Sequence, residues 1–246
     1  MAKAPRPGRV KTRLVPPLTE AAATALSAAF LRDITENIAL ASRSTPISGY
    51  VAFAPAEDED LFDGLLAEGT RLVLADGNIG MATGLSGIGC SLLHAARALS
   101  ARHHSICMVN SDSPTLPTAF LIEAAEALSG PADRVVLGPA EDGGYYLIGM
   151  KAPHAGLFAD IAWSTPRVAD QTRQRARTLG LDLVELPSWY DVDDRATLLR
   201  LLDAVDTPSP GAVPAYAAPA TAGCARQLDL RRLLASTDAH AVSAVR

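Results

Sequence analysis

Short apolar runs typical of buried strands alternate with longer stretches of helical periodicity along most of the 246 residues. Because parallel strands need a crossover between them, usually a helix, this alternation predicts a mostly parallel sheet with helices on both faces. The fold class is therefore α/β. The expected strands are 49–54, 71–75, 105–108, 134–138 and 182–186, and the expected helices are 19–43, 58–67, 91–101, 117–129, 164–179 and 196–204.

The composition excludes several classes of protein. Hydrophobic residues make up 48% and charged residues 20% of the chain, so most of it can pack a core. The net charge of −5 argues against nucleic acid or an anionic membrane as a partner. Three cysteines without C-x-x-C spacing suggest a reducing cytoplasm and no structural zinc, and no apolar run is long enough to cross a bilayer.

One expected strand ends in a carboxylate. The run Ser105–Met108 is followed by Asp112 and then by Pro114, which has no N–H group and so ends the strand pairing. Ligands bind at the carboxyl edge of open α/β sheets, and a carboxylate there suits a hard cation that holds phosphate oxygens. The alternative is that Asp112 caps the turn after the strand.

The first fifteen residues are basic and contain no acid. Clustered cations around Gly8 suit a phosphate-bearing ligand, whereas the alternative is a solvated basic tail. A phosphate-binding loop usually follows a strand, yet only two residues precede Lys3, so we expect the first strand to be truncated or absent. The basic residues are Lys3, Arg6, Arg9, Lys11 and Arg13.

Two further segments carry acidic residues. The stretch Asp142-Gly143-Gly144 predicts a hairpin turn, and its glycines also allow backbone to approach a substrate that Asp142 would bind. Asp191 and Asp193 flank Val192, so in extended chain both side chains point to one side and make a second carboxylate site. The alternative is that Asp193 or Asp194 caps the next helix.

The composition changes near the carboxyl end. Residues 1–205 are expected to form one domain, residues 206–224 a Pro- and Ala-rich linker, and residues 225–246 a helical tail. The leucines of the tail are expected to dock either on the main domain or on a second subunit, which would make a homodimer.

Taken together, the motifs closely resemble the bacterial rSAM/selenodomain-associated transferases, a branch of the GT-A, nucleotide-diphospho-sugar transferase superfamily. The resemblance spans residues 1 to about 205 and implies a Rossmann-like GT-A sheet. The motifs are Lys3–Leu14, Ser111–Pro114, Gly138–Gly149, Trp163–Pro166 and Trp189–Asp193.

The resemblance implies a transferase that acts on a nucleotide or nucleotide sugar and a small-molecule acceptor. In the related molybdenum-cofactor and 2-phospho-lactate guanylyltransferases, a basic loop holds the triphosphate and two polar positions hold Mg2+. This assigns phosphate binding to the basic segment, with Lys11, Arg13 and Asp112 as catalytic residues. It assigns Mg2+ (or Mn2+) to Asp112 and Asp193, with Asp191 nearby. The phosphate-binding residues would be Lys3, Gly8, Arg9, Lys11 and Arg13.

The superfamily offers a second chemistry. Glycosyltransferases of this type usually carry Asp-x-Asp, whereas this chain has Asn110-Ser111-Asp112 and so lacks the first acid. Together with the basic segment, this favours nucleotidyl transfer to a small anionic acceptor, with release of pyrophosphate. Glycosyl transfer from a nucleotide-diphospho-sugar and a non-catalytic nucleotide-binding module are the alternatives.

Overall fold

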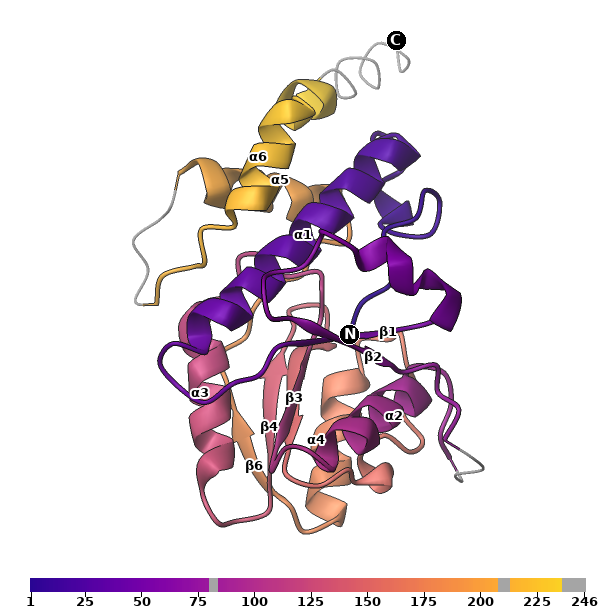
Figure 1. The fold of residues 1–246 in the computed structure, drawn as a ribbon, viewed down its shortest axis with the longest axis vertical. Helices are drawn as coiled ribbons and strands as arrows, with labels where there is room; N and C mark the ends of the chain where they lie inside the picture. Colours follow the sequence, from indigo (N-terminus) through magenta and orange to yellow (C-terminus); the bar gives the residue numbers. More distant parts are fainter. Residues whose placement is uncertain (80–83, 208–212, 236–246) are drawn as a thin grey trace.

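The structure is a computed structural model that describes residues 1–79, 84–207 and 213–235. Its strands form two sheets: the parallel pair β1 and β2, and a four-stranded sheet in the order β3-β5-β4-β6 (Figure 1). Strand β5 is antiparallel to β3 and β4, whereas β4 and β6 are parallel. The strands are β1 (Tyr50–Phe53), β2 (Arg71–Leu74), β3 (Ile106–Val109), β4 (Arg134–Pro139), β5 (Tyr145–Met150) and β6 (Asp182–Glu185).

Helices cover both faces of the larger sheet, which confirms the predicted α/β class. Neighbouring residues of one strand point to opposite faces, so Val135 packs with α2 and α4 whereas Val136 packs with α3. The helices are α1 (Glu20–Ala41), α2 (Ile88–Ser100), α3 (Thr118–Ser129), α4 (Val168–Thr178), α5 (Arg195–Asp206) and α6 (Pro219–Gln227). Three short 3-10 segments are η1 (Thr12–Leu14), η2 (Ala56–Phe62) and η3 (Ala155–Leu157).

Local sequence signals set some helix ends but not others. Helix α1 begins as expected, because the Thr19 hydroxyl accepts a hydrogen bond from the Ala22 N–H at 3.1 Å. The predicted start of α4 near Ser164 is wrong: Ser164 adopts a left-handed conformation with φ 60°, and the helix begins only at Val168. The predicted helix at 58–67 is the 3-10 segment η2.

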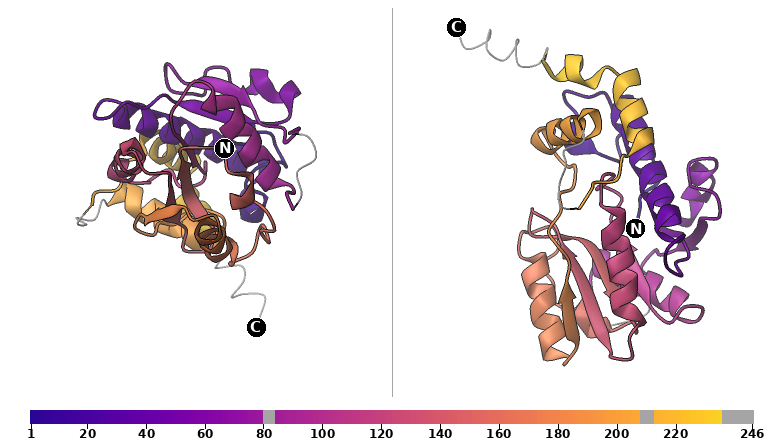
Figure 2. Two further views of the ribbon diagram at one scale, coloured as in Figure 1. Left: turned by 90° about the horizontal axis from the view of Figure 1, so that it is seen from below. Right: turned by 90° about the vertical axis from the view of Figure 1, so that its left-hand side faces the viewer.

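The predicted linker is too long at its carboxyl end. Helix α6 begins at Pro219, inside the stretch expected to be a linker, and it lies beside α1 (Figure 2). Its amino end lacks a side-chain cap of its own, and Asp33 of α1 supplies one. The Asp33 carboxylate is fully buried and accepts hydrogen bonds from the backbone N–H groups of Ala220 and Thr221, at 3.0 and 2.7 Å.

The described part of the tail docks on the main domain, one of the two arrangements expected. Leu230 and Leu234 are buried in one cluster with Phe30 of α1 and Leu198 of α5. Residues 208–212 of the expected linker and residues 236–246 of the expected tail lie outside the described residues. Across the described ranges, none of the helices combines the length and apolarity that a bilayer span requires.

The first two residues bond to the edges of both sheets. The Ala2 N–H donates to the carbonyl of Ala52 in β1, and the Met1 ammonium donates to the carbonyl of Val109 in β3, both at 2.9 Å. Residues 1 and 2 therefore bridge the two sheets, and the basic segment starts from this point.

Replacing Asp33 tests how strongly α6 is held to α1. We expect Asp33→Ala to lower the free energy of unfolding by about 2 to 4 kcal/mol, because two buried N–H groups lose a charged acceptor. Asp33→Asn keeps one acceptor oxygen, so its loss should be smaller. Urea denaturation measures both, with the exposed Glu126→Ala of α3 as the control. A loss for Asp33→Ala no larger than that of the control would contradict this role of Asp33.

Candidate functional site

Asp112 follows the carboxyl end of β3, where the sequence places it. Its side chain is 36% exposed, whereas the next residues, Ser113 and Thr115, are buried. The backbone carbonyl of Asp112 accepts a hydrogen bond from the N–H of Val192 at 2.9 Å. This bond fixes the distant acidic segment around Val192 directly beside the end of β3.

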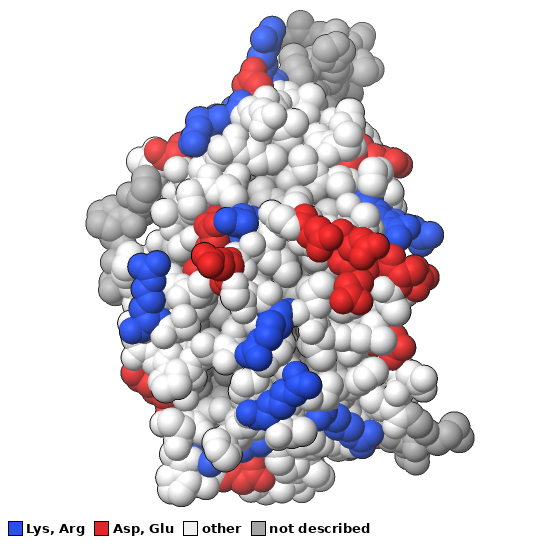
Figure 3. Space-filling model, viewed as in Figure 1, with Lys and Arg blue, Asp and Glu red and all other residues white. Residues whose placement is uncertain are grey.

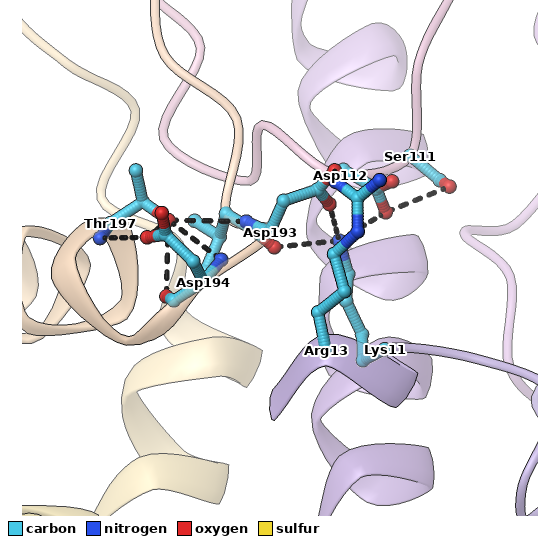
Figure 4. A network of polar contacts seen from close by, with 8 residues as sticks. Lys11, Arg13, Ser111, Asp112, Asp193, Asp194 and Thr197 are labelled. Atoms are coloured by element: carbon cyan, nitrogen blue, oxygen red, sulfur yellow. Dashed lines mark hydrogen bonds and ion pairs between the residues drawn. The ribbon is translucent and has the colours of Figure 1, made fainter. Parts of the chain in front are cut away.

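Asp193 and Asp194, which precede α5, have different roles. Asp194 caps α5: its carboxylate accepts from the Thr197 N–H at 2.8 Å, and the Thr197 hydroxyl accepts from the Asp194 N–H. The side chain of Asp193 is free of this capping task and points instead toward Asp112 (Figure 4). The predicted second carboxylate is therefore Asp193, and the predicted helix cap is Asp194.

The ammonium of Lys11 lies between these two carboxylates (Figure 4). Its Nζ is 2.8 Å from Asp112 Oδ1 and 3.1 Å from Asp193 Oδ1, and it donates to the Val192 carbonyl at 2.7 Å. The Lys11 side chain is only 5% exposed and lies over the ring of Phe30, 5.4 Å from its centre. Three oxygen acceptors thus satisfy the three donors of a nearly buried cation.

The rest of the basic segment divides into two parts. Arg13 extends toward Asp193, with Nη1 3.4 Å from Oδ2, and its side chain remains 75% exposed. Lys3, Gly8 and Arg9 are exposed to solvent. Arg6 pairs with Asp58 of η2, over which acidic side chains gather in Figure 3. Only the end of the predicted phosphate loop, Lys11 and Arg13, therefore contacts the carboxylates.

The Asp142-Gly143-Gly144 segment forms the predicted turn between β4 and β5. The Gly144 N–H donates to Asp142 Oδ1 at 2.8 Å, and the Gly143 N–H donates to the Ala140 carbonyl at 3.1 Å. Gly143 has φ 89°, and a Cβ there would lie 2.2 Å from the carbonyl oxygen of Pro166. The N–H groups of both glycines are thus used within the turn, whereas the Asp142 residue is exposed.

Four carboxyl groups share this edge of the molecule. Burial, together with the negative charges of Asp142, Asp193 and Asp112, raises the pKa of Asp191 to about 6. Asp191 is therefore close enough to interact electrostatically with the other three carboxylates. Within the part of the chain that the structure describes, however, no three acidic, histidine or cysteine side chains are arranged as a ready group of metal ligands. The predicted set of Asp112, Asp191 and Asp193 is thus not preassembled.

The donor chemistry of the remaining pair fits a hard divalent cation. Asp112 and Asp193 offer carboxylate oxygens, the ligands that Mg2+ and Mn2+ prefer, and phosphate oxygens of a substrate supply the others. The point at which they converge already attracts a positive charge, namely the ammonium of Lys11. A divalent ion at that point requires the ammonium to leave at least one carboxylate.

Sequence reasoning missed the residues that hold the turn against α5. Both terminal guanidinium nitrogens of Arg200 pair with the Glu141 carboxylate, at 2.6 and 3.1 Å, and the guanidinium lies 4.0 Å from the centre of the Tyr190 ring. The Tyr190 hydroxyl in turn contacts that of Thr115 at 2.9 Å. Glu141 and Arg200 are 59 positions apart, and no local sequence pattern signals this pair.

Comparison with known proteins shows the fold. The sequence pattern of a family described as "Uncharacterized protein conserved in bacteria (DUF2064)" matches residues 38–165. The crystal structure of a "putative nucleotide-diphospho-sugar transferase" from Desulfovibrio desulfuricans G20 is 24% identical, with a TM-score of 0.76 over 96% of this chain and 94% of that chain. No curated protein matches the chain.

A weaker structural match is CMP:2-keto-3-deoxy-manno-octonic acid synthetase complexed with CTP, which is 12% identical, with a TM-score of 0.46 over 70% of this chain and 85% of that chain. The chain therefore has the fold of the Desulfovibrio protein, as the sequence motifs led us to expect. The narrower resemblance to rSAM/selenodomain-associated transferases stays a prediction.

The raised pKa of Asp191 predicts a pH dependence of stability. In the folded state the Asp191 carboxyl group stays protonated up to a pH of about 6, whereas in the unfolded chain it ionises near pH 3.8. The folded state therefore binds more protons between these values, and the free energy of unfolding should fall as the pH rises through them. Asp191→Asn should remove this fall, which we expect to be about 1 to 2 kcal/mol because solvent screens the partly exposed side chain. Urea denaturation of chelator-treated protein from pH 4 to 7 measures the difference. Parallel pH profiles for the two proteins would show that the Asp191 pKa is not raised.

Proposed function

This chain belongs to the family of uncharacterized proteins conserved in bacteria (DUF2064), and we propose that it is a Mg2+-dependent transferase acting on a nucleoside triphosphate or a nucleotide sugar. The observation that carries the proposal is the convergence of Asp112 and Asp193 on Lys11 at the carboxyl end of β3. This edge is where α/β sheets bind ligands, and here it holds both a carboxylate pair and cations. The name of the Desulfovibrio protein supports the same class of substrate.

Asp112 and Asp193 would hold the metal ion, which is Mg2+ or Mn2+ in this proposal. When bound, such an ion supplies positive charge to donor phosphate oxygens and fixes their position. The exposed side of the pair is open to a substrate, because the side chains of Asp112 and Asp193 are 36% and 41% exposed. Asp191 lies near Asp112 and Asp193. It would add to or lower the negative charge around the metal according to its own protonation, rather than serve as a third fixed ligand.

The chemistry we favour is nucleotidyl transfer. An acceptor oxygen forms a bond to the α-phosphorus, the bond from that phosphorus to the bridging oxygen breaks, and pyrophosphate leaves with the electron pair. Lys11 and Arg13 neutralise the charge that builds on the leaving group, as cations do in other phosphoryl transfers. Arg13 is well placed for this because its guanidinium is largely exposed and only weakly held by Asp193.

The acceptor in this proposal is a small molecule that already carries an anionic group, such as a phosphate or carboxylate, so no general base is needed. The exposed Lys3 and Arg9 would attract the anion together with Arg13. Asp142 would contact hydroxyl or amino groups through the carboxylate oxygen that the turn leaves unused. Gly143 and Gly144 act by shaping the turn, since their N–H groups are already bonded.

Glycosyl transfer is the second candidate, and the name of the Desulfovibrio protein favours it. The same carboxylate pair would then hold the diphosphate of a nucleotide sugar. The sequence Asn110-Ser111-Asp112 provides one acid where glycosyltransferases of this type usually show two, which is why we place this candidate second. A non-catalytic module would bind nucleotide without turnover.

The reaction products separate these candidates. Purified protein is incubated with Mg2+, each nucleoside triphosphate or nucleotide sugar in turn, and a pool of small phosphorylated and carboxylated acceptors. We expect release of pyrophosphate, which 31P NMR detects. In Asp112→Asn the rate of this release should fall by at least about 100-fold. Release of a nucleoside diphosphate would establish glycosyl transfer instead. Binding without either product, at a melting temperature raised by nucleotide, would establish the non-catalytic module.

The position of Lys11 predicts an unusual response to metal. Because the ammonium competes for the carboxylates, Lys11→Met should tighten binding of Mn2+ alone by about tenfold while it abolishes turnover. Asp112→Asn should weaken Mn2+ binding. Arg13→Met is the matched control and should change Mn2+ affinity little, because the Arg13 side chain is 75% exposed and its contact with Asp193 is 3.4 Å long. Electron paramagnetic resonance of free Mn2+ measures these affinities. Unchanged affinity in both Lys11→Met and Asp112→Asn would place the metal elsewhere.

A further inference from the structure

The two segments that form the candidate site are anchored in the same apolar cluster. Leu14 and Leu18 follow Lys11 closely in the amino-terminal segment, and both leucines are buried in this cluster. Val192 immediately precedes Asp193, and it is fully buried in the same cluster. Each half of the site is therefore fixed by apolar residues beside it in the chain.

Lys11 has a backbone conformation that the surrounding structure must hold in place. Its φ is 47° and its ψ is 37°, in the left-handed region that residues other than glycine seldom adopt. Such a conformation persists only where the contacts around it determine it. The ion pairs with Asp112 and Asp193 supply part of these contacts, and the burial of Leu14 supplies another part. The position of Lys11 therefore depends on what packs against Leu14.

A segment from the far end of the chain packs into this cluster. We call residues 219–235, which begin with α6, the carboxyl-terminal brace. Its Leu230 and Leu234 are buried, and both lie in one cluster with Leu14 and with Leu198 of α5. The leucines of the brace thus join the two halves of the site through one continuous apolar core.

Polar contacts attach the brace to a helix on each side. The buried Asp33 carboxylate of α1 caps the first turn of α6. On the side of α5, the Arg231 guanidinium pairs with both Asp203 and Asp206, at 2.9 and 2.7 Å. These ion pairs hold the end of α5 that is farther along the chain from the site.

Another contact holds the beginning of α5, next to the site. The Arg195 guanidinium donates to the backbone carbonyl of Leu234 at 3.2 Å. Arg195 is the first residue of α5, and it follows the Asp194 cap and Asp193 directly in the chain. The brace therefore holds α5 at both ends. It also lies against α1 (Figure 2), whereas the described backbones of α1 and α5 have little direct contact with each other.

We propose that the carboxyl-terminal brace positions the candidate site, with Leu234 and Arg231 as positioning residues. They hold α5, and with it Asp193, at the place where the Lys11 ammonium meets both carboxylates. They act through α5 and the apolar cluster rather than on a substrate. The inference rests on the proposed function for the meaning of this site, whereas the geometry that it asserts does not depend on the reaction.

The side-chain resonance of Lys11 reports this geometry without any substrate. The chain has three lysines, so 15N-lysine labelling of the full protein gives ammonium signals from Lys3, Lys11 and Lys151 alone. An ammonium that is buried and hydrogen-bonded exchanges its protons with water slowly, and it speeds up when its surroundings open. Lys11 is nearly buried, whereas Lys3 is exposed. Lys151 donates to the Gly130 carbonyl, away from the apolar cluster, and serves as the internal reference.

We expect Leu234→Ala to speed proton exchange of the Lys11 ammonium by about tenfold or more, because the truncated side chain leaves a cavity between the two halves of the site. Leu128→Ala in α3 is the matched control, because Leu128 is similarly buried but belongs to another cluster. The Lys151 signal should stay unchanged in both variants. Equal acceleration of Lys11 exchange in the two variants, or none in either, would overturn the proposal.

Arg231→Met leaves the apolar core intact and so provides a test even where Leu234→Ala does not fold. Its side chain is 48% exposed, so we expect a smaller acceleration of Lys11 exchange, about threefold. Arg231→Lys keeps the charge and should restore part of the slow exchange. Arg232→Met changes the exposed neighbouring arginine and should have no effect. Identical exchange in Arg231→Met and Arg232→Met would remove Arg231 from the positioning residues.

Turnover separates this inference from the proposed function. With release of pyrophosphate as the assay, Leu234→Ala should lower kcat by about tenfold relative to Leu128→Ala, because small displacements of reacting groups slow transfer. Faster Lys11 exchange in Leu234→Ala, in a protein whose unsubstituted form releases no product, would refute the proposed function and support the brace. A kcat that Leu234→Ala leaves unchanged despite faster Lys11 exchange would overturn the role of the brace in positioning the site.

Discussion

The ammonium of Lys11 joins three distant parts of the chain at one point. Transfer of a cation into a nearly dry environment is costly unless each donor is satisfied and the charge is balanced. Here Asp112, Asp193 and the Val192 carbonyl meet both conditions. The amino-terminal segment, the end of β3 and the segment before α5 are thereby fixed relative to one another, so that two carboxylates 81 positions apart (193 minus 112) face a common point.

The same arrangement sets the electrostatics of the proposed function. The carboxylates provide the negative charge that a divalent ion needs, and Lys11 and Arg13 provide positive charge for phosphate oxygens. Asp142 adds further negative charge at this edge, and burial together with the neighbouring carboxylates raises the pKa of Asp191. A phosphoryl transfer requires little covalent chemistry of the protein, so in the proposed function positioned charges of this kind would supply most of the catalysis.

The sequence supports predictions whose causes are local. The start of the helix near residue 19, the strand that ends before Asp112 and the Asp-Gly turn each depend on residues a few positions apart, and the structure confirms all three. The sequence leaves open which of Asp193 and Asp194 caps the helix. Both precede α5, and an aspartate suits a helix cap as well as the second carboxylate of the site. Only the geometry of Thr197 separates them. Likewise, five cations in one segment gave no indication that Lys11 alone is buried.

Long-range contacts account for what the sequence did not indicate. A buried carboxylate at Asp33 caps α6 from another helix, so a Pro- and Ala-rich stretch that suggests a linker folds into a packed helix. The Glu141–Arg200 pair is similar, since each member alone is an ordinary surface charge. The hydrogen bonds by which Met1 and Ala2 bridge the two sheets also join segments that no local pattern connects.

The central claim is that Asp112 and Asp193 share one cation site beside Lys11. A crystal structure with Mn2+ and a non-hydrolysable nucleoside triphosphate tests it most directly, through the anomalous signal of the metal. The account predicts a peak within about 2.5 Å of an oxygen of each carboxylate, with the triphosphate between the metal and Arg13. A metal bound elsewhere, with the Lys11 ammonium still on both carboxylates and the triphosphate away from them, would contradict it.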